Sequence, residues 1–457
     1  MPTLPSAFVD RIHQQFGNES NSLLDAFGEP AKTSVLMNPF KSDLNAPFDE
    51  AKSLPWNDMG FLLNHRPSFT IDPRLHGGHY YVQESSSMVI GFVLKQLFKG
   101  QTDLNCIDLC AAPGGKSLNI LNYLQGSGLL VSNEVNPLRN SILRETLCKW
   151  GSLNRLVTKR NSNDFAALRG LFDFVLVDAP CSGEGMFRKD EFAISQWSTH
   201  LVKQCASTQR SILENAWALV ADGGYLAFST CTFADEENAE NSRWLFSQLN
   251  CESIQIEVPT SWELNELKDH FFGLRFLPHK VPGEGFFISV FRKKGGESSK
   301  SFKSTNPFWK SALREHRVAI DSWISLSETE HVYINSKNEL SVVHISSDKT
   351  LKLLDILVRN DLVAEPGSIL ATVKGKDIIP EHGMAMCNLE RTESLIVDIS
   401  REIALAYLRR DLSDILTEKR GWLILRSEGV VLGWIKKMDN RINNYYPVDW
   451  RIRMNTG

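Results

Sequence analysis

The chain has 457 residues, of which 42% are hydrophobic and 23% are charged, and its formal net charge is −4. This composition is typical of a globular protein with two or three domains, and it excludes wholesale disorder. The sequence does not open with a basic region followed by an apolar core, and no apolar run reaches the roughly 18 residues of a membrane span. We therefore expect a cytoplasmic protein that does not cross a membrane.

Prolines are scattered through the first part of the chain, with a candidate boundary at Ile71-Asp-Pro-Arg and another near residue 85. We assign residues 1–85 to a small N-terminal domain that binds RNA or packs on its neighbour.

Residues 102–292 alternate apolar runs with helical patterns, which indicates an α/β fold with a doubly wound, Rossmann-like sheet. Strands are expected over residues 105–109, 128–133, 174–178, 224–228 and 285–292, with helices over 116–124, 137–150 and a segment ending near 220. Pro137 suits the first turn of its helix, and Gly151 suits the C-terminal cap. The predicted catalytic domain covers residues 86–294.

A loop of small residues follows the first strand of this domain. It consists of Cys110, Ala111, Ala112, Pro113, Gly114, Gly115 and Lys116. Its glycines let the backbone approach a ligand closely, and the helix that follows offers free N–H groups. The loop is neither the dinucleotide Gly-x-Gly-x-x-Gly nor a phosphate-binding P-loop. A nucleoside cofactor without phosphate fits it better, and we expect S-adenosylmethionine.

Glu134 ends the second strand, 20 residues after Gly114. A carboxylate at this spacing accepts hydrogen bonds from ribose hydroxyls in nucleotide-binding folds. Glu134 is therefore predicted to bind the cofactor.

Two cysteines, Cys181 and Cys231, each follow a strand that is expected to be buried. The carboxyl ends of the strands are where open α/β sheets place their chemistry, and a thiolate is a strong nucleophile near neutral pH. The pair predicts covalent catalysis, in which one thiol attacks and the other assists. The eight cysteines of the chain lack metal-ligand spacing, so they are expected to be reduced thiols without a metal.

The segment Lys293–Ser304 is polar and rich in glycine and serine, as flexible linkers are, which places a boundary near residue 295. Residues 295–457 form the predicted C-terminal region, with a hairpin over residues 422–435. From Arg401 onward there are eleven Lys and Arg against seven Asp and Glu, and aromatic residues interleave with them after Trp434. This pattern suits RNA binding through base stacking and phosphate contacts.

Three motifs resemble the hallmarks of the Sun/Nop family of RNA 5-methylcytosine methyltransferases. They are Asp108–Lys116, Asp178–Gly185 and Ser229–Thr232, and weaker similarity extends over roughly residues 30–292. The run Glu184–Asp190 and the long C-terminal extension resemble the RsmF branch, which acts on small-subunit ribosomal RNA. The resemblance implies a methyltransferase domain followed by a C-terminal PUA-like α+β module.

The resemblance also implies a reaction at C5 of cytosine. That carbon is too weak a nucleophile on its own, so a thiolate first adds to C6, and a base later removes the C5 proton. The family assigns the attack to Cys231 and product release to Cys181, although the Pro-Cys cysteine is the nucleophile in DNA cytosine methyltransferases. Asp178 is implied to lie between cofactor and base, near the cytosine N3/N4 edge. Lys116 is expected to hold Asp178 or the nucleotide backbone.

Two positions depart from the family pattern. Asn161 stands where an Asp usually accepts from the adenine amino group, and Asp164 is the alternative acceptor. Leu36 stands where an N-terminal segment usually has arginine. We expect lower cofactor affinity from the first departure and a missing RNA or domain contact from the second.

Together these features predict an S-adenosylmethionine-dependent RNA (cytosine-5) methyltransferase that acts on small-subunit ribosomal RNA as a monomer. A transfer-RNA 5-methylcytosine methyltransferase is one alternative, and a ribosome-assembly or RNA-binding factor with weak catalysis is another. Intact Cys181 and Cys231 argue against the assembly factor. A methyltransferase acting on amino groups would have Asp/Asn-Pro-Pro-aromatic where this chain has Asp178-Ala-Pro-Cys.

Overall fold

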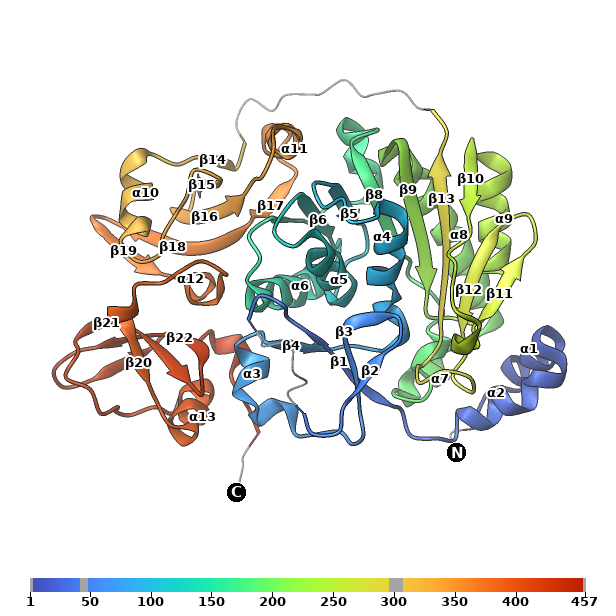
Figure 1. The fold of residues 1–457 in the computed structure, drawn as a ribbon, viewed down its shortest axis with the longest axis horizontal. Coiled ribbons are helices and arrows are strands. Elements are labelled where there is room, and N and C mark those ends of the chain that lie inside the picture. The colour runs from blue at the N-terminus through green and yellow to red at the C-terminus, as the bar shows by residue number, and fades with distance from the viewer. Residues whose placement is uncertain (1–2, 42–47, 296–306, 455–457) are drawn as a thin grey trace.

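The structure, a computed structural model, describes residues 3–41, 48–295 and 307–454 (Figure 1). Among these residues, its largest sheet has ten strands in the order β11-β12-β13-β9-β8-β5-β6-β7-β17, with β10 paired to β13. The five central strands run parallel: β5 (Asn105–Asp108), β6 (Leu129–Asn133), β7 (Arg155–Thr158), β8 (Phe172–Asp178) and β9 (Val220–Thr230). Antiparallel strands flank them: β10 (Cys251–Ile254), β11 (Asn265–Lys268), β12 (Phe272–Phe276), β13 (Phe286–Lys293) and β17 (Val363–Pro366).

Helices cover both faces of this sheet, which explains why its central strands are almost entirely apolar. On one face, α4 (Ile90–Phe98), α5 (Gly115–Leu124) and α6 (Pro137–Trp150) pack against side chains such as Leu130 and Leu176. On the other face, α8 (Thr199–Leu219), α9 (Ala239–Gln248) and α11 (Asp348–Arg359) share a core with Ile107 and Val175. The predicted doubly wound α/β fold is confirmed.

Helix α6 shows how local sequence sets the element boundaries. The Asn136 side chain accepts hydrogen bonds from the N–H groups of Leu138 and Arg139, at 2.9 and 3.2 Å, and Pro137 occupies the first turn. Gly151 ends the helix with φ of 86°. The helix thus begins and ends at the residues expected from the sequence.

The N-terminal part contains α1 (Ser6–Phe16), α2 (Ser20–Ala26) and α3 (Pro73–His76). Its antiparallel sheet has the order β2-β3-β1-β4, formed by β1 (Thr33–Met37), β2 (Lys52–Leu54), β3 (Asn57–Leu63) and β4 (Tyr80–Val82). Leu36 on β1 is fully buried and packs in the core shared with Met88 and Leu118. This position therefore supports packing between β1 and the catalytic domain, and the missing contact predicted for Leu36 stays a prediction.

The C-terminal part contains two further sheets. The first has the order β14-β15-β16-β18-β19, from β14 (Trp309–Ser311), β15 (Glu330–Asn335), β16 (Glu339–His344), β18 (Ser368–Lys374) and β19 (Asp377–Pro380). The second has the order β20-β21-β22-β23, from β20 (Ile396–Asp398), β21 (Gly421–Ser427), β22 (Val430–Lys437) and β23 (Ile442–Asn444). Helices α10 (Arg314–Asp321), α12 (His382–Met386) and α13 (Arg401–Arg409) pack with these sheets. Strands β21 and β22 form the expected hairpin, whereas residues 296–304 of the expected linker lie outside the described residues.

Strand β17 joins the C-terminal part to the catalytic sheet. It pairs antiparallel with β7, and the fully buried Arg155 forms an ion pair with Glu365 at 3.1 Å. Arg144 on α6 approaches the same carboxylate at 3.4 Å. The domain boundaries near residues 85 and 295 stay a prediction. Strand β17 comes after residue 295 in sequence, yet it belongs to the sheet of the catalytic domain.

Within the described ranges, no helix combines the length and the apolar character that spanning a membrane requires.

Replacing Glu365 with Ala would leave the Arg155 guanidinium buried without its anionic partner. Because an uncompensated buried charge is strongly unfavourable, we expect the free energy of unfolding to fall by about 3–5 kcal/mol in chemical denaturation. Asp355→Ala, which breaks an exposed ion pair with Arg359, serves as the control and should cost at most about 1 kcal/mol. Equal losses in the two variants would contradict this account of the junction.

Candidate active site

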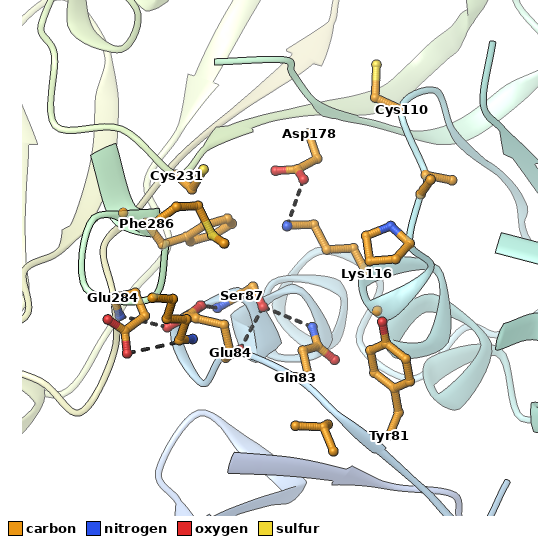
Figure 2. A pocket seen from close by; sticks show the side chains of 18 of the residues that line it. Tyr81, Gln83, Glu84, Ser87, Cys110, Lys116, Asp178, Cys231, Glu284 and Phe286 are labelled. Atoms are coloured by element: carbon orange, nitrogen blue, oxygen red, sulfur yellow. Dashed lines mark hydrogen bonds and ion pairs between the residues drawn. The ribbon is translucent and has the colours of Figure 1, made fainter. Parts of the chain in front are cut away.

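A cavity of about 390 Å3 lies beside the carboxyl ends of β5, β8 and β9 (Figure 2). This volume lies within the range of roughly 300–1,000 Å3 that is usual for cofactor pockets. Residues from the N-terminal part and from the catalytic domain line it together, among them Tyr81, Gln83, Ser87, Asp108, Cys110, Ala111, Ala112, Pro113, Gly115, Lys116, Asp178, Cys231, Glu284 and Phe286. Most of the cofactor loop predicted from the sequence therefore faces this space.

The loop after β5 needs both of its glycines. Gly114 has φ of 120°, and an added Cβ would lie 2.8 Å from Thr146 Cγ2. An added Cβ on Gly115 would lie 3.0 Å from the Gln83 side chain. These close approaches bring the start of α5, with its free N–H groups, to the edge of the cavity.

Asp178 is held by two neighbours at the end of β8. Lys116 Nζ donates to Asp178 Oδ2 at 2.8 Å, and Ser229 Oγ donates to Oδ1 at 2.9 Å. Burial favours the neutral amine, but the attraction to Asp178 outweighs it and raises the pKa of Lys116 above its ordinary value. Lys116 is therefore a charged partner of Asp178, which is one of the two roles expected for it.

Asp108 lines the cavity, and sequence reasoning assigned it no role of its own. It is fully buried, and Ser117 Oγ donates to its Oδ2 at 2.8 Å, while Oδ1 has no side-chain donor. Burial, reinforced by the charge of Asp178, raises the pKa of Asp108 to about 7. The sequence does contain a signal for this residue, because Asp108 begins the motif Asp108–Lys116. Tyr81 on β4 and Gln83 just after it were also missed, because this segment reaches the cavity only through tertiary packing.

The two thiols meet at the carboxyl ends of neighbouring strands. Cys181 Sγ lies 3.1 Å from Cys231 Sγ, and Cys231 lines the cavity. The hydrogen bond with Cys231, together with burial, raises the pKa of Cys181 well above that of an ordinary thiol. The site therefore places a protonated thiol against a second sulfur that has access to the cavity.

Three predicted cofactor residues, Gly114, Glu134 and Asn161, do not line the cavity. Gly114 lies on the side of the loop that packs against Thr146 of α6. Glu134 is buried at the end of β6, where its Oε1 accepts the N–H of Asn136 at 2.8 Å and its Oε2 lies 3.4 Å from Arg139 Nη1. Arg139 itself lines the cavity and donates to Ala112 O at 2.7 Å. Glu134 is thus connected to the site through Arg139.

The expected adenine acceptors, Asn161 and Asp164, bond to each other's backbone. The Asn161 side chain accepts from the Asp164 N–H, and Asp164 Oδ2 accepts from the Asn161 N–H at 3.0 Å. This capping box begins the helical turn Ser162–Leu168, and both residues are exposed outside the cavity lining. Their role toward adenine stays a prediction.

The cavity residues fit S-adenosylmethionine. The buried Asp108 Oδ1 offers an acceptor suited to an ammonium group, and the loop offers close backbone approach without a phosphate cradle. In the described part of the chain, no group of three His, Cys, Asp or Glu side chains is arranged to hold a metal ion.

Three protein-family models match the chain in succession. Residues 4–85 match the N-terminal domain of 16S rRNA methyltransferase RsmF, residues 95–292 match 16S rRNA methyltransferase RsmB/F, and residues 394–452 match the methyltransferase RsmF PUA domain. All three models describe RsmF or RsmB/F methyltransferases, and together they cover most of the chain. They confirm the family resemblance, the methyltransferase domain with its N-terminal and PUA-like domains, and S-adenosylmethionine as the cofactor.

The chain is similar to several named methyltransferases, and it spans less than two thirds of the length of the first of them. A ribosomal RNA small subunit methyltransferase F from Pectobacterium atrosepticum is 31% identical over 319 residues, which span 64% of this chain and 63% of that protein. The one from Psychromonas ingrahamii is 27% identical over 467 residues, which span 97% and 96%. A solved methyltransferase homolog protein from Pyrococcus horikoshii superimposes with a TM-score of 0.55 at 26% identity, covering 63% of this chain and 95% of its own.

Replacing Gly114 with Ala should weaken cofactor binding. The left-handed φ and the contact with Thr146 together add strain of about 1–3 kcal/mol, which shifts the start of α5. We expect at least a tenfold rise in the Kd for S-adenosylmethionine, measured by isothermal titration calorimetry. Gly126→Ala is the matched control, because Gly126 has φ of 85° with nothing within 4 Å of an added Cβ. An unchanged Kd in the Gly114 variant would show that the loop does not shape the cofactor site.

Proposed function

We propose that this protein transfers a methyl group from S-adenosylmethionine to C5 of a cytosine in small-subunit ribosomal RNA. The observation that carries the proposal is the pair of thiols, Cys181 and Cys231, placed 3.1 Å apart beside a cavity that also contains Asp178. The names of the relatives, ribosomal RNA small subunit methyltransferase F, support this substrate class. A chemistry without a covalent step would have no need of two adjacent thiols.

Cys231 is the attacking residue in this proposal, because its side chain lines the cavity. Its thiolate forms a bond to C6, the C5–C6 π electrons shift to the C4–C5 bond, and N3 takes up the displaced electron pair. The resulting enamine is nucleophilic at C5. The cofactor supplies the methyl group that C5 then takes. Asp178, held by Lys116 and Ser229, is placed to bond the N3/N4 edge and to stabilise the charge that develops on the ring.

Cys181 completes the reaction in this proposal. After methylation the C5 proton must leave before the C5–C6 double bond can form again and expel Cys231. The sulfur of Cys181 lies beside the sulfur whose bond must break. The raised pKa of Cys181 keeps this thiol protonated while Cys231 attacks, so Cys181 must lose its own proton before its thiolate can accept the C5 proton.

The RNA substrate must present its cytosine outside any helix, because a stacked base cannot enter a closed pocket. We propose that the PUA-like region, residues 394–452, grips the RNA around that base. The monomeric state and the cytoplasmic location stay predictions.

Cys231→Ala should abolish the covalent complex that wild-type protein forms with RNA containing 5-fluorocytosine, because fluorine at C5 blocks the release step. Denaturing gel electrophoresis measures this complex directly. Cys205→Ala, which removes another partly buried thiol, is the control and should leave trapping intact. A complex that persists in Cys231→Ala and disappears in Cys181→Ala would reverse the two roles. Trapping is measured in parallel with small-subunit RNA and with transfer RNA. The RNA that forms the covalent complex identifies the substrate class.

Cys181→Ala should accumulate an adduct on ordinary cytosine RNA. Methylation proceeds in this variant, but the C5 proton is not removed, so Cys231 stays attached. We expect a stable protein–RNA band in a denaturing gel and a turnover rate at least a hundredfold below wild type, in line with the loss of one general base. Normal turnover would remove Cys181 from the mechanism.

A further inference from the structure

Helices α1 and α2 pack on the segments that follow the two thiols. Figure 1 shows them at one side of the molecule, apart from the β1–β4 sheet that follows them in sequence. Their apolar side chains form a cluster with residues shortly after Cys181 and Cys231, which comprises Phe8, Ile12, Leu23, Phe27, Phe187, Trp197 and Phe233. Helices α1 and α2 therefore contact both segments that follow Cys181 and Cys231, which we call the catalytic loops.

Glu184 connects α1 to both loops. It lies three residues after Cys181 and is fully buried. Its Oε2 accepts the N–H of Phe233, two residues after Cys231, at 2.9 Å. Its Oε1 accepts from Trp197 Nε1 at 2.8 Å and forms an ion pair with Arg11 of α1. One carboxylate thus holds the two loops and the N-terminal helix together.

Gln15 adds a second connection one turn along α1. Its Nε2 donates to Phe233 O at 2.6 Å and to Asp235 Oδ1 at 3.2 Å. Both backbone groups of Phe233 are therefore bonded, the N–H by Glu184 and the carbonyl by Gln15. The Gly185 N–H also donates to Cys231 O at 2.7 Å, so the two loops are in direct contact.

We propose that Arg11 and Gln15 are positioning residues, through which α1 sets the placement of the Cys181 and Cys231 sulfurs for the covalent step. This inference rests on the proposed function. Covalent catalysis requires reacting groups placed to within about 0.5 Å, and loops reach that precision only when neighbouring groups fix them. Without Arg11 the buried Glu184 carboxylate loses its cationic partner, which favours its displacement. Displacement releases the bond to Phe233 and lets the two sulfurs separate.

The test compares Arg11→Met, Arg11→Lys and Gln15→Ala with wild type. We expect kcat to fall about tenfold or more in Arg11→Met and several-fold in Gln15→Ala, with the KM for S-adenosylmethionine unchanged, and Arg11→Lys to recover part of the loss. Arg359→Met, which breaks only an exposed ion pair with Asp355, is the matched control. If Arg11→Met loses folded protein, as read by circular dichroism, Gln15→Ala decides. A loss of folded protein in Gln15→Ala as well would make α1 merely structural.

A second measurement reads the positions of the sulfurs without any RNA. Dibromobimane becomes strongly fluorescent when it bridges two neighbouring thiols, and the signal lost in Cys181→Ala reports the Cys181–Cys231 pair. We expect this signal to fall several-fold in Arg11→Met and to stay at the wild-type level in Arg359→Met. Wild-type bridging and wild-type kcat in Arg11→Met would overturn the inference. Failure of the wild type to form the covalent RNA complex would instead overturn the proposed function and leave the bridging result to decide the role of α1.

Discussion

The hydrogen-bonded register of β8 and β9 is the constraint on which the site depends. The two strands are parallel neighbours, and Asp178 stands opposite Ser229. Cys181 follows Asp178 by three residues and Cys231 follows Ser229 by two, so the two thiols meet with their sulfurs 3.1 Å apart. A slip of one residue would turn the side chains of β9 to the opposite face and remove Ser229 from Asp178. The register therefore fixes the carboxylate and both sulfurs at once.

The central strands and helices could be predicted because their signals are local. The apolar run ending at Asp178 and the capping residues of α6 lie within a few positions of the elements they define. The pairing of β17 with β7 could not be predicted, since Val363 pairs with Thr158, far away in sequence, and so short a strand leaves no local pattern. The N-terminal sheet and its contribution of Tyr81 and Gln83 to the cavity depend in the same way on tertiary packing.

Candidate site residues could be predicted where the position of the backbone alone brings them to the cavity. The loop from Cys110 to Lys116 and the two thiols lie where their strands end, so spacing was sufficient to bring them together. Glu134 and Asn161 differ, because the direction of each side chain is set by a hydrogen bond to a nearby N–H group, that of Asn136 or Asp164. The spacing of residues along the sequence does not show whether such a side chain bonds to a nearby N–H group or points into the cavity.

Buried charges tie the outer parts of the chain to the catalytic domain. Glu365 reaches Arg155 from the C-terminal side, and Arg11 reaches Glu184 from the N-terminal side. Such pairs add little net stability compared with apolar contacts, but breaking one is costly, so they favour a single arrangement of the parts. The N-terminal and C-terminal parts thereby keep a defined geometry relative to the catalytic domain.

In the proposed reaction Cys231 and Cys181 enable methyl transfer from S-adenosylmethionine to carbon 5 of a cytosine in small-subunit ribosomal RNA. The most direct test of this reaction is nucleoside mass spectrometry of small-subunit ribosomal RNA after incubation with the protein and S-adenosylmethionine carrying a labelled methyl group. We expect the label in 5-methylcytidine. Label in N4-methylcytidine or in a ribose-methylated nucleoside would contradict the proposed reaction.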